Sequence, residues 1–585
     1  MGSITQPVLD EAYDFIVCGG GTSGCVVAGR LAEDASAKIL LLEAGPSHEE
    51  LENVHMAGGF PKLFDKETDW NIVSEPGAGI NGRTVNLSRG KFLGGSSGCN
   101  GTLCVRGSKQ DYDDWGVPGW GGDDFFRYMR KAETFRGKPW FEAAEGAHGG
   151  DGHLLVEPPD PAPISKLLIR SMESKGLPLD HDMFSHGERA NGCGHVPRTI
   201  NQGTRTTGAD FVTRKNRRDN ITILTGAHVD KVLTEPKPGG RGFRAVGVRA
   251  LRDDGSVLDV RATKEVVVSG GAYCSPNILN RSGIGARAEL DKHGIPTLVD
   301  LPGVGKNLMD HLIVFLMYET DKAGLTLDEH LFHEGAYEKS QKQWRDDKTG
   351  ALSVVPFGVF AFTRLDARLA DSDAWASAPR QPGRDPMGLT PAQPNAELMT
   401  CESFFGPGQY KVRPTEGQHV FCIIPELFAA RSRGSVALQS ADPAAKPVVD
   451  TGFLTDPLDA EVLAEACRFG NDIVLDGAGT KDIVKGPWPP TASHHKLKTR
   501  EEWKAYVRDH ATTCYHASGT CAMGKASDGK AVVDETLTVI GVDGLRVADC
   551  SIIPILHGGH SQMPAYGIGE KAADLIKAKW GLKSS

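Results

Sequence analysis

Several segment types are missing from this 585-residue sequence, and each absence excludes a class of protein. No run of about eighteen apolar residues occurs, so no transmembrane helix is predicted. Residues 1–13 have no basic stretch followed by an apolar one, so we expect no secretory signal and a cytoplasmic location. Basic residues are not in excess: the net charge is −10. A negative surface repels phosphate groups, so we expect neither nucleic acid nor a membrane as a partner.

The 12 cysteines form no C-x-x-C pair. Without a secretory signal, reduced thiols are the default, and this spacing predicts neither a zinc site nor a redox disulfide. We therefore expect no bound metal. The sequence also shows no internal repeats, and its length predicts two to four domains.

The N-terminal sequence has the pattern of a dinucleotide-binding βαβ unit. Residues 13–18 form an apolar run typical of a buried parallel strand. Residues 19–24 (GGGTSG) follow at once and fit G-x-G-x-x-G, after which a helical stretch leads to a second apolar run at residues 38–42. Glu43 ends that run, about twenty residues after the last glycine, where an acid is expected to meet ribose hydroxyls. FAD or NAD fits this pattern better than NADP.

Each glycine of the motif has a distinct expected task. Gly19 permits the tight turn from strand to helix, and Gly21 lets the backbone approach a pyrophosphate. Gly24 lets the helix pack closely on the strand. The helix N-terminus then offers free N–H groups and positive potential to the phosphates.

Further blocks of sequence decide between FAD and NAD. These blocks are residues 89–101 (RGKFLGGSSGCNG), 271–279 (GAYCSPNIL), 303–311 (GVGKNLMDH), 515–520 (YHASGT) and 545–549 (LRVAD). In their order and content they resemble the glucose-methanol-choline (GMC) oxidoreductases along nearly the whole chain. This resemblance implies FAD as the cofactor. The few relatives that bond covalently to flavin use a histidine in the first block, which this chain lacks, so we expect non-covalent binding.

The resemblance also implies where FAD is bound. The loop from Leu93 to Thr102 is expected along the pyrophosphate and flavin, Val229 at the adenine, and Asp549 and Cys550 near the ribityl chain. A turn beginning at Ser561 is expected beside the pyrimidine end of the flavin. The full set of expected cofactor-binding residues is Gly19, Gly21, Thr22, Ser23, Gly24, Glu43, Ala44, Arg89, Leu93, Gly95, Ser96, Asn100, Gly101, Thr102, Val229, Ser269, Asp549, Cys550, Ser561, Gln562 and Met563.

Oxidation of an alcohol requires a base for the hydroxyl proton, and a histidine suits this task because its ordinary pKa is near neutrality. His516 matches the family's catalytic histidine. His560 matches a second active-site position that the family fills with His or Asn. We expect His516 to accept the proton and His560 to orient the substrate oxygen. The expected reaction converts a small primary alcohol to an aldehyde, with O2 or another acceptor taking the electrons.

Other residues are tentative members of the substrate pocket. Tyr515 precedes the catalytic histidine, and Phe404, Phe405 and Tyr410 lie in a stretch bounded by Gly and Pro. His557 stands where the family usually has Pro. It could line the pocket, donate a second hydrogen bond or face solvent.

Two departures from the family pattern leave alternatives open. His557 and His560 have the spacing of metal ligands, but no carboxylate or Cys accompanies them in sequence. Cys99 replaces an aliphatic residue beside the flavin loop, where a packing role is favoured over reactivity.

Three other functions compete with alcohol oxidation. Residues 94–98 also fit G-x-S-x-G, the nucleophile elbow of hydrolases, with Ser96 as nucleophile. That reading leaves the dinucleotide motif unexplained. FAD-containing lyases or cyclases on this fold could use His516 and His560 for acid–base chemistry without net oxidation. A non-catalytic FAD module would leave both histidines without a purpose.

The expected fold is an α/β Rossmann-type FAD-binding domain plus an α+β substrate domain with a large antiparallel sheet. We expect the FAD-binding domain to comprise residues 1–155, 205–315 and 515–585, and the substrate domain to comprise residues 156–204 and 316–514. Strands are predicted at residues 221–232, 420–424 and 434–438, helices at 461–469 and 500–510, and a loop insertion at 366–394.

Overall fold

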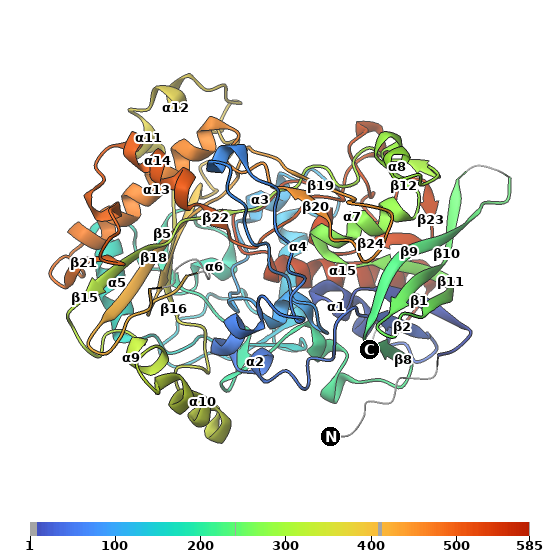
Figure 1. Cartoon of the computed structure of the whole chain (residues 1–585), viewed down its shortest axis with the longest axis horizontal. Helices are drawn as coiled ribbons and strands as arrows, with labels where there is room; N and C mark the ends of the chain where they lie inside the picture. The colour runs from blue at the N-terminus through green and yellow to red at the C-terminus, as the bar shows by residue number, and fades with distance from the viewer. Residues whose placement is uncertain (1–8, 240–241, 407–411, 584–585) are drawn as a thin grey trace.

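The computed structural model describes residues 9–239, 242–406 and 412–583. Two large sheets lie at opposite ends of the molecule. Figure 1 shows the first sheet, with β1, β2 and β8 to β11, on the right, and the second, with β5, β15, β16 and β18, on the left.

The first sheet is built around a buried parallel strand. β1 (Ala12–Cys18) pairs in parallel with β2 (Ile39–Leu42) on one side and with β11 (Val257–Val268) on the other. Ile, Leu and Val residues dominate these strands because both faces of a parallel sheet are covered. The remaining strands are β8 (Ile221–Leu224), β9 (Ala227–Pro236), β10 (Phe243–Arg252), β23 (Val542–Asp543) and β24 (Leu545–Val547), with β9, β10 and β11 forming an antiparallel meander.

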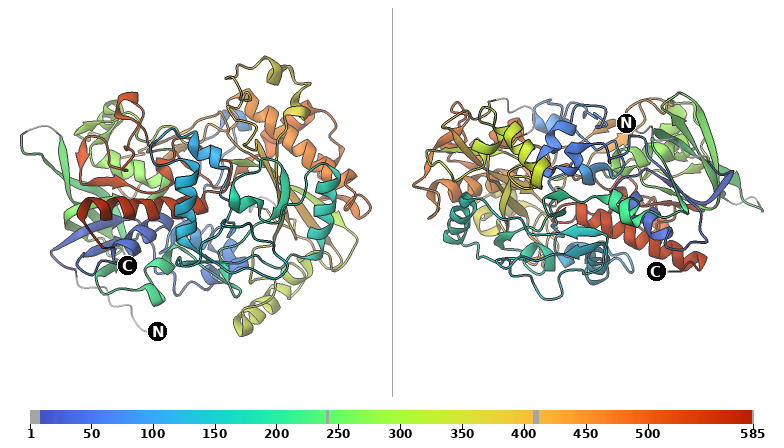
Figure 2. Two further views of the ribbon diagram at one scale, coloured as in Figure 1. Left: turned by 180° about the vertical axis from the view of Figure 1, so that it is seen from behind. Right: turned by 90° about the horizontal axis from the view of Figure 1, so that it is seen from below.

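Helices from distant parts of the chain cover this sheet. α1 (Thr22–Leu31) packs against α15 (Gln562–Trp580), which packs in turn against α4 (Gly122–Ala132). The left view of Figure 2 shows α15 running beside the sheet. α7 (Gly271–Arg281) starts directly after β11. The N-terminal and C-terminal segments therefore form one structural unit.

The strand order changes direction at β1. The chain continues from β1 to β2 on one side and returns to β11 on the other. A crevice opens at such a point, outside the carboxyl ends of the strands. Gly19, Glu43 and Ser269 directly follow β1, β2 and β11, so all three stand at this crevice.

The second sheet is antiparallel. Its strands are β5 (Gly192–His195), β14 (Leu312–Ile313), β15 (Leu316–Thr320), β16 (Phe357–Thr363), β17 (Ala396–Cys401), β18 (His419–Leu427), β21 (Val484–Trp488) and β22 (Thr512–Thr513). β18 is central because it pairs with β14, β15 and β17.

Helices cover the outer side of the second sheet. α13 (Pro457–Asp476) packs against β18, α14 (Arg500–His510) and α5 (Pro163–Ser174). α13 begins with Asp456, whose side chain accepts a hydrogen bond from the Leu458 N–H at 3.0 Å, and with a proline at the first helical position. Both features are typical helix starts.

The structure confirms the strands expected near residues 420–424 and 434–438 and the helices expected near 461–469 and 500–510. Two expectations were wrong. Residues 221–232 form two strands, because Gly226 has φ +64° and turns the chain between β8 and β9. The segment 366–394 contains two short helices, α11 (Asp366–Leu369) and α12 (Asp373–Ser377).

The division into FAD-binding and substrate segments stays a prediction. β14 pairs with β18 and β22 of the second sheet, although its residues precede position 315. In the described part of the chain, no helix has the length and apolar character needed to cross a membrane.

Candidate active site

A cavity of about 630 Å³ extends from the crevice of the first sheet to the inner face of the second. Its first end is lined by the glycine loop, by residues 88–101, by β9 and by the start of α7. Its other end is lined by the histidines of the C-terminal segment and by apolar side chains of the second sheet. An elongated ligand would therefore contact both sheets.

The glycine loop leaves room for a diphosphate. A Cβ on Gly21 would meet only the Ser269 carbonyl oxygen, at 4.0 Å, whereas a Cβ on Gly24 would lie 2.0 Å from the Gly19 carbonyl oxygen. The open side of Gly21 faces the cavity, and Gly24 is needed for close packing. Gly21 is the N-cap of α1 and has no capping side chain, so the first helical N–H groups are available to an anion.

Glu43 lies between two loops at the cavity wall. Its Oε2 accepts the Gly20 N–H at 2.9 Å, and its Oε1 accepts the Gly45 N–H at 2.8 Å. Burial raises its pKa, and these two N–H groups oppose the shift. Each oxygen keeps a further lone pair, so the carboxylate can also accept ribose hydroxyls.

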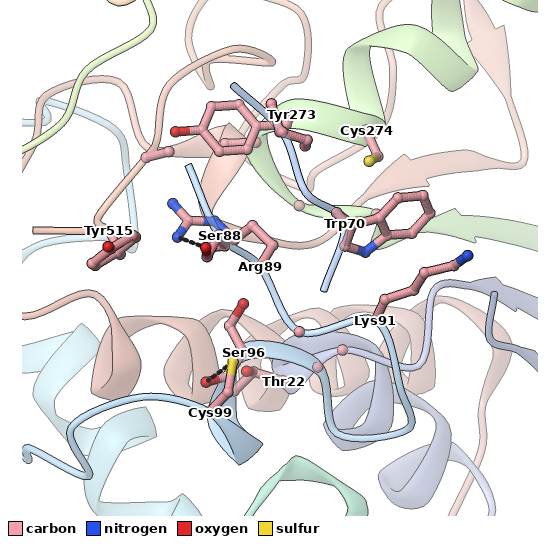
Figure 3. A pocket seen from close by; sticks show the side chains of 18 of the residues that line it. Thr22, Trp70, Ser88, Arg89, Lys91, Ser96, Cys99, Tyr273, Cys274 and Tyr515 are labelled. Carbon is pink, nitrogen blue, oxygen red and sulfur yellow. Dashed lines mark hydrogen bonds between the residues drawn. The ribbon is translucent and has the colours of Figure 1, made fainter. Parts of the chain in front are cut away.

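Residues 88–101 form a further part of the cavity wall and contribute side chains to two facing sides of it. Figure 3 shows Arg89 between Tyr273 and Tyr515, with Ser96 and Thr22 on the facing side. The Arg89 guanidinium lies 5.0 Å from the centre of the Tyr273 ring. Cys99 also lines the cavity, and burial raises the pKa of its thiol to about 12. The thiol is therefore protonated at neutral pH, as a packing role requires.

The C-terminal segment closes the cavity between its two ends. The Asp549 carboxylate accepts hydrogen bonds from the Gly271 N–H at 2.9 Å and the Ser275 hydroxyl at 2.6 Å. Gln562 donates to the Leu103 carbonyl oxygen at 3.1 Å and accepts from Asn100. Asp549, Asn100 and Gln562 therefore have fixed orientations at the wall.

His516 and His560 stand side by side at the second end of the cavity, and their ring centres are 4.6 Å apart. Both are buried. Burial lowers the pKa of His516 to about 3, so its imidazole is neutral and can accept a proton. Burial also opposes the charging of His560, but the Glu397 carboxylate, 2.8 Å from its Nε2, outweighs burial and raises the pKa of His560.

Behind His516 lie His311 and Glu426, and the three side chains form a cluster. His516 Nδ1 is 3.0 Å from His311 Nδ1 and 3.3 Å from Glu426 Oε1, and His311 Nδ1 is 3.0 Å from the same oxygen. Among the described residues, nothing donates a well-directed hydrogen bond to Glu426 Oε1, so its effect on the two rings is electrostatic. Burial favours the neutral acid, but the surrounding imidazoles hold the pKa of Glu426 well below its usual value.

Asp310 fixes the backbone beneath this cluster. One carboxylate oxygen accepts the N–H of His311 at 2.9 Å and the N–H of His516 at 2.7 Å. Tyr515, just before His516, has φ +62°. The backbone therefore departs from a regular strand between Cys514 and His516. His516 therefore sits on a backbone that is tied to residues 310 and 311.

The cavity brings together most of the residues expected from the sequence. Those that line it are Gly19, Gly21, Thr22, Ser23, Glu43, Ala44, Arg89, Gly95, Ser96, Asn100, Gly101, Val229, Ser269, Phe405, Tyr515, His516, Asp549, Cys550, His560, Ser561 and Gln562. Gly24, Leu93, Thr102 and Met563 lie behind this surface and support it. Tyr410 lies outside the described residues.

Two tentative pocket residues are placed elsewhere. Phe404 is buried in the core, where its ring meets Phe332 edge-on at 5.3 Å, and it does not line the cavity. His557 is fully buried and stacks on Tyr112, with its Nε2 3.3 Å from the His560 carbonyl oxygen. His557 therefore neither lines the pocket nor faces solvent. In the described part of the chain it joins no group of possible metal ligands.

Sequence reasoning missed the acidic partners of the histidines. Glu397 on β17 and Glu426 on β18 are directly opposite each other in the sheet register. Neither belongs to a recognisable motif. His311 ends the GVGKNLMDH block, but nothing in that block indicates its contact with His516. Cys514 was also missed: its thiol lies 3.2 Å from Glu426 Oε2 and lines the cavity.

A dinucleotide crevice joined to a pair of histidines is the arrangement expected of a flavin-dependent oxidoreductase. Models of the GMC oxidoreductase family match residues 13–313 and 430–569. The chain belongs to this family, and FAD is its cofactor. The open side of Gly21, the uncapped α1 N-terminus and Glu43 fit the diphosphate and ribose of that group.

Similar proteins cover almost the full chain. An oxygen-dependent choline dehydrogenase of Paraburkholderia xenovorans is 33% identical over 97% of this chain and 95% of its own length. A pyranose dehydrogenase of Leucoagaricus meleagris is 30% identical, with 97% and 93% covered. The structure of a formate oxidase variant from Aspergillus oryzae RIB40 has a TM-score of 0.90 at 31% identity, with 98% of this chain and 99% of that chain covered.

Proposed function

We propose that this protein oxidises a small primary alcohol to an aldehyde, with His516 as the base that removes the hydroxyl proton. The observation that carries the proposal is the position of His516. Its ring lines the cavity, while its Nδ1 is engaged behind the wall by His311 and Glu426. Relatives named for choline, pyranose and aryl alcohol support an alcohol as the donor.

The contact between His516 and His311 restricts the tautomer of the base. Two ring nitrogens at 3.0 Å share one proton, because two N–H groups would clash and two lone pairs would repel. With that proton on His516 Nδ1, the Nε2 lone pair is free to accept the substrate proton. Glu426 then stabilises the positive charge that His516 acquires.

His560 has a different task in this proposal. Its Nε2 is held by Glu397, which favours a protonated ring and fixes its orientation beside His516. A protonated His560 would donate a hydrogen bond to the substrate oxygen and hold the hydroxyl near His516. Two neighbouring histidines with pKa values shifted in opposite directions can thus act as base and donor.

When bound, FAD supplies the hydride acceptor at N5, and O2 or another acceptor takes the electrons. We propose that FAD is held without a covalent bond. Cys99 lies within the expected flavin loop and lines the cavity. Its thiol has a raised pKa and is therefore a poor nucleophile at neutral pH.

The test is the visible spectrum of the purified holoprotein, mixed with primary alcohols without oxygen. We expect the flavin absorbance to bleach, and His516→Ala to slow bleaching by about 10²–10⁴-fold, as is typical for loss of a general base. His330→Ala is a control, because that side chain is 55% exposed and does not line the cavity. Bleaching at the full rate in His516→Ala would disprove the role of the base.

The same experiment separates other outcomes. Rapid return of colour in air, with peroxide, indicates an oxidase, and slow return indicates another acceptor. Flavin that bleaches with no alcohol, together with non-redox turnover, would favour a lyase or cyclase on this fold.

A further inference from the structure

The inner face of the second sheet changes from acidic to apolar side chains within two residues along each of two strands. In β17 and β18, Glu397 is opposite Glu426 and Met399 is opposite Ile424. Side chains two residues apart on a strand point to the same face and lie about 7 Å apart. The carboxylates that hold the histidines are therefore followed directly by an apolar pair, and Met399 and Ile424 both line the cavity.

Phenylalanine rings extend this apolar surface. The ring of Phe405 lies 4.8 Å from that of Phe357, 6.1 Å from that of Phe60 and 6.3 Å from that of Phe315, and all four line the cavity. These four rings, with Met399 and Ile424, are called the apolar wall. Its members are drawn from a 3-10 helix, from the strand segments of the second sheet and from the loop after β17.

The apolar wall lies at the histidine end of the cavity. Phe357 is 6.0 Å from Phe360, whose ring is 6.2 Å from His560. On the other side, Phe64 stacks with Tyr515 at 6.4 Å, next to His516. A hydroxymethyl group at the two histidines would therefore direct the rest of its molecule across the wall.

The chemistry of the wall distinguishes among alcohols. Its side chains offer no N–H or O–H donor, and the nearby Cys514 thiol is engaged with Glu426. Each sugar hydroxyl buried there without a partner would cost about 5- to 150-fold in affinity. An aromatic ring would instead gain about 2- to 10-fold for each ring contact beyond the gain from burial.

A quaternary ammonium alcohol fits the wall less well than a neutral ring does. Cation–π attraction is strongest over Trp, whereas the wall contains Phe. The carboxylates of Glu397 and Glu426 lie behind the histidines and outside the cavity lining, so they offer no direct ion pair to such a group.

We propose that the substrate is a primary alcohol with an apolar, ring-bearing body, of the arylmethanol class. This assignment rests on the proposed alcohol oxidation and specifies its substrate. The apolar wall binds the ring, while His516 and His560 hold the hydroxyl.

The first experiment measures anaerobic flavin bleaching by the holoprotein with benzyl alcohol, glucose and choline. We expect the second-order rate constant for benzyl alcohol to exceed that for glucose by at least about 100-fold, as expected for several unpaired hydroxyls. It should also exceed that for choline, because the wall offers the cation of choline no ion pair. Bleaching by glucose or choline at a rate comparable to benzyl alcohol would overturn the substrate assignment and leave alcohol oxidation intact. Bleaching by none of a wide panel of alcohols would overturn both.

Neighbouring phenylalanines provide a matched pair of variants. Phe405→Leu removes a ring that lines the cavity, whereas Phe404→Leu removes the adjacent ring, which points into the core. We expect Phe405→Leu to raise KM for benzyl alcohol by about 3- to 30-fold and to change KM for a short aliphatic alcohol little. Phe404→Leu should leave both KM values within about 2-fold. FAD content and circular dichroism verify that both variants fold. Equal KM changes in the two variants, or none in Phe405→Leu, would contradict the proposal.

Discussion

Gly21 and Gly24 of the glycine loop are expected to respond differently to substitution by alanine. One substitution should affect folding, and the other should affect FAD binding. In Gly24→Ala the new Cβ would lie 2.0 Å from the Gly19 carbonyl oxygen and 3.1 Å from Ser269 Cβ. The first contact is with backbone, so the strand and helix must separate. Such overpacking costs about 1–3 kcal/mol or more, which exceeds the gain of about 1 kcal/mol from the better helix propensity of alanine.

Gly21→Ala should leave folding nearly unchanged. Gly21 has φ −75°, which alanine adopts readily, and the nearest atom to its Cβ is 4.0 Å away. The methyl group would enter the space that we expect the diphosphate to occupy. If the clash between this methyl group and the cofactor costs as much as overpacking in a core, FAD binding should weaken by about 5- to 150-fold.

The assay compares the apoproteins and their reconstitution with FAD. Circular dichroism melting of each apoprotein gives its Tm, and titration with FAD gives Kd. We expect Gly24→Ala to lower the Tm of the apoprotein by several degrees, and Gly21→Ala to keep the Tm but lose FAD affinity. Wild-type Kd in Gly21→Ala, or an equal loss of Tm in both variants, would refute the assignment of the phosphate site.

Two further predictions concern the groups around the histidines, and a third concerns Cys99. Glu426→Gln removes the negative charge beside His516, so the pKa of His516 should fall further. Anaerobic flavin bleaching should then slow by about 10- to 100-fold, and an unchanged pH–rate profile would contradict the role of Glu426. In the folded state Glu397 raises the pKa of His560, and burial raises the pKa of Glu397 to about 7. The folded pair therefore binds protons more tightly than the unfolded chain does, so its contribution to stability falls as pH rises through neutrality. Glu397→Gln should therefore flatten the dependence of Tm on pH between about 6 and 8, and retention of the wild-type slope would exclude the pair as its source. The pKa of Cys99 is raised to about 12, so iodoacetamide at pH 8 should modify Cys99 more than about 100-fold more slowly than free cysteine. Mass spectrometry measures the labelling, and rapid labelling of Cys99 would contradict the assignment of an inert thiol.

The first sheet and its crevice could be predicted because their signals are local. The glycine loop, the strand before it and Glu43 lie within about thirty residues, and each has a backbone task that restricts the residue type. The same reasoning failed at residues 221–232, where the apolar alternation continues across a glycine turn. It was Gly226, with φ +64°, that divided the strand, and a glycine inside a strand pattern is an ambiguous signal.

The groups around the histidines depend on pairings between distant strands. Glu397 and Glu426 become neighbours only through the register of β17 and β18, and they meet the histidines only when the C-terminal segment packs against the second sheet. The different placements of Phe404 in the core and Phe405 at the cavity likewise depend on distant contacts, with Phe332 and Phe357 respectively. No pattern within either segment encodes these contacts.

This arrangement couples the two ends of the molecule. His516 and His560 belong to the C-terminal segment, whose strand β24 pairs with β11 of the first sheet, whereas Glu397 and Glu426 belong to the second sheet. The pKa values of the histidines therefore depend on how the two sheets are docked. If FAD occupies the cavity that both sheets line, its binding free energy favours the docked state. The apolar wall begins two residues beyond the carboxylates on the same strands. Substitutions at Met399 or Ile424 are thus expected to change the proposed preference among alcohols without moving the carboxylates beside the histidines, because alternate positions of one strand face carry the two tasks separately.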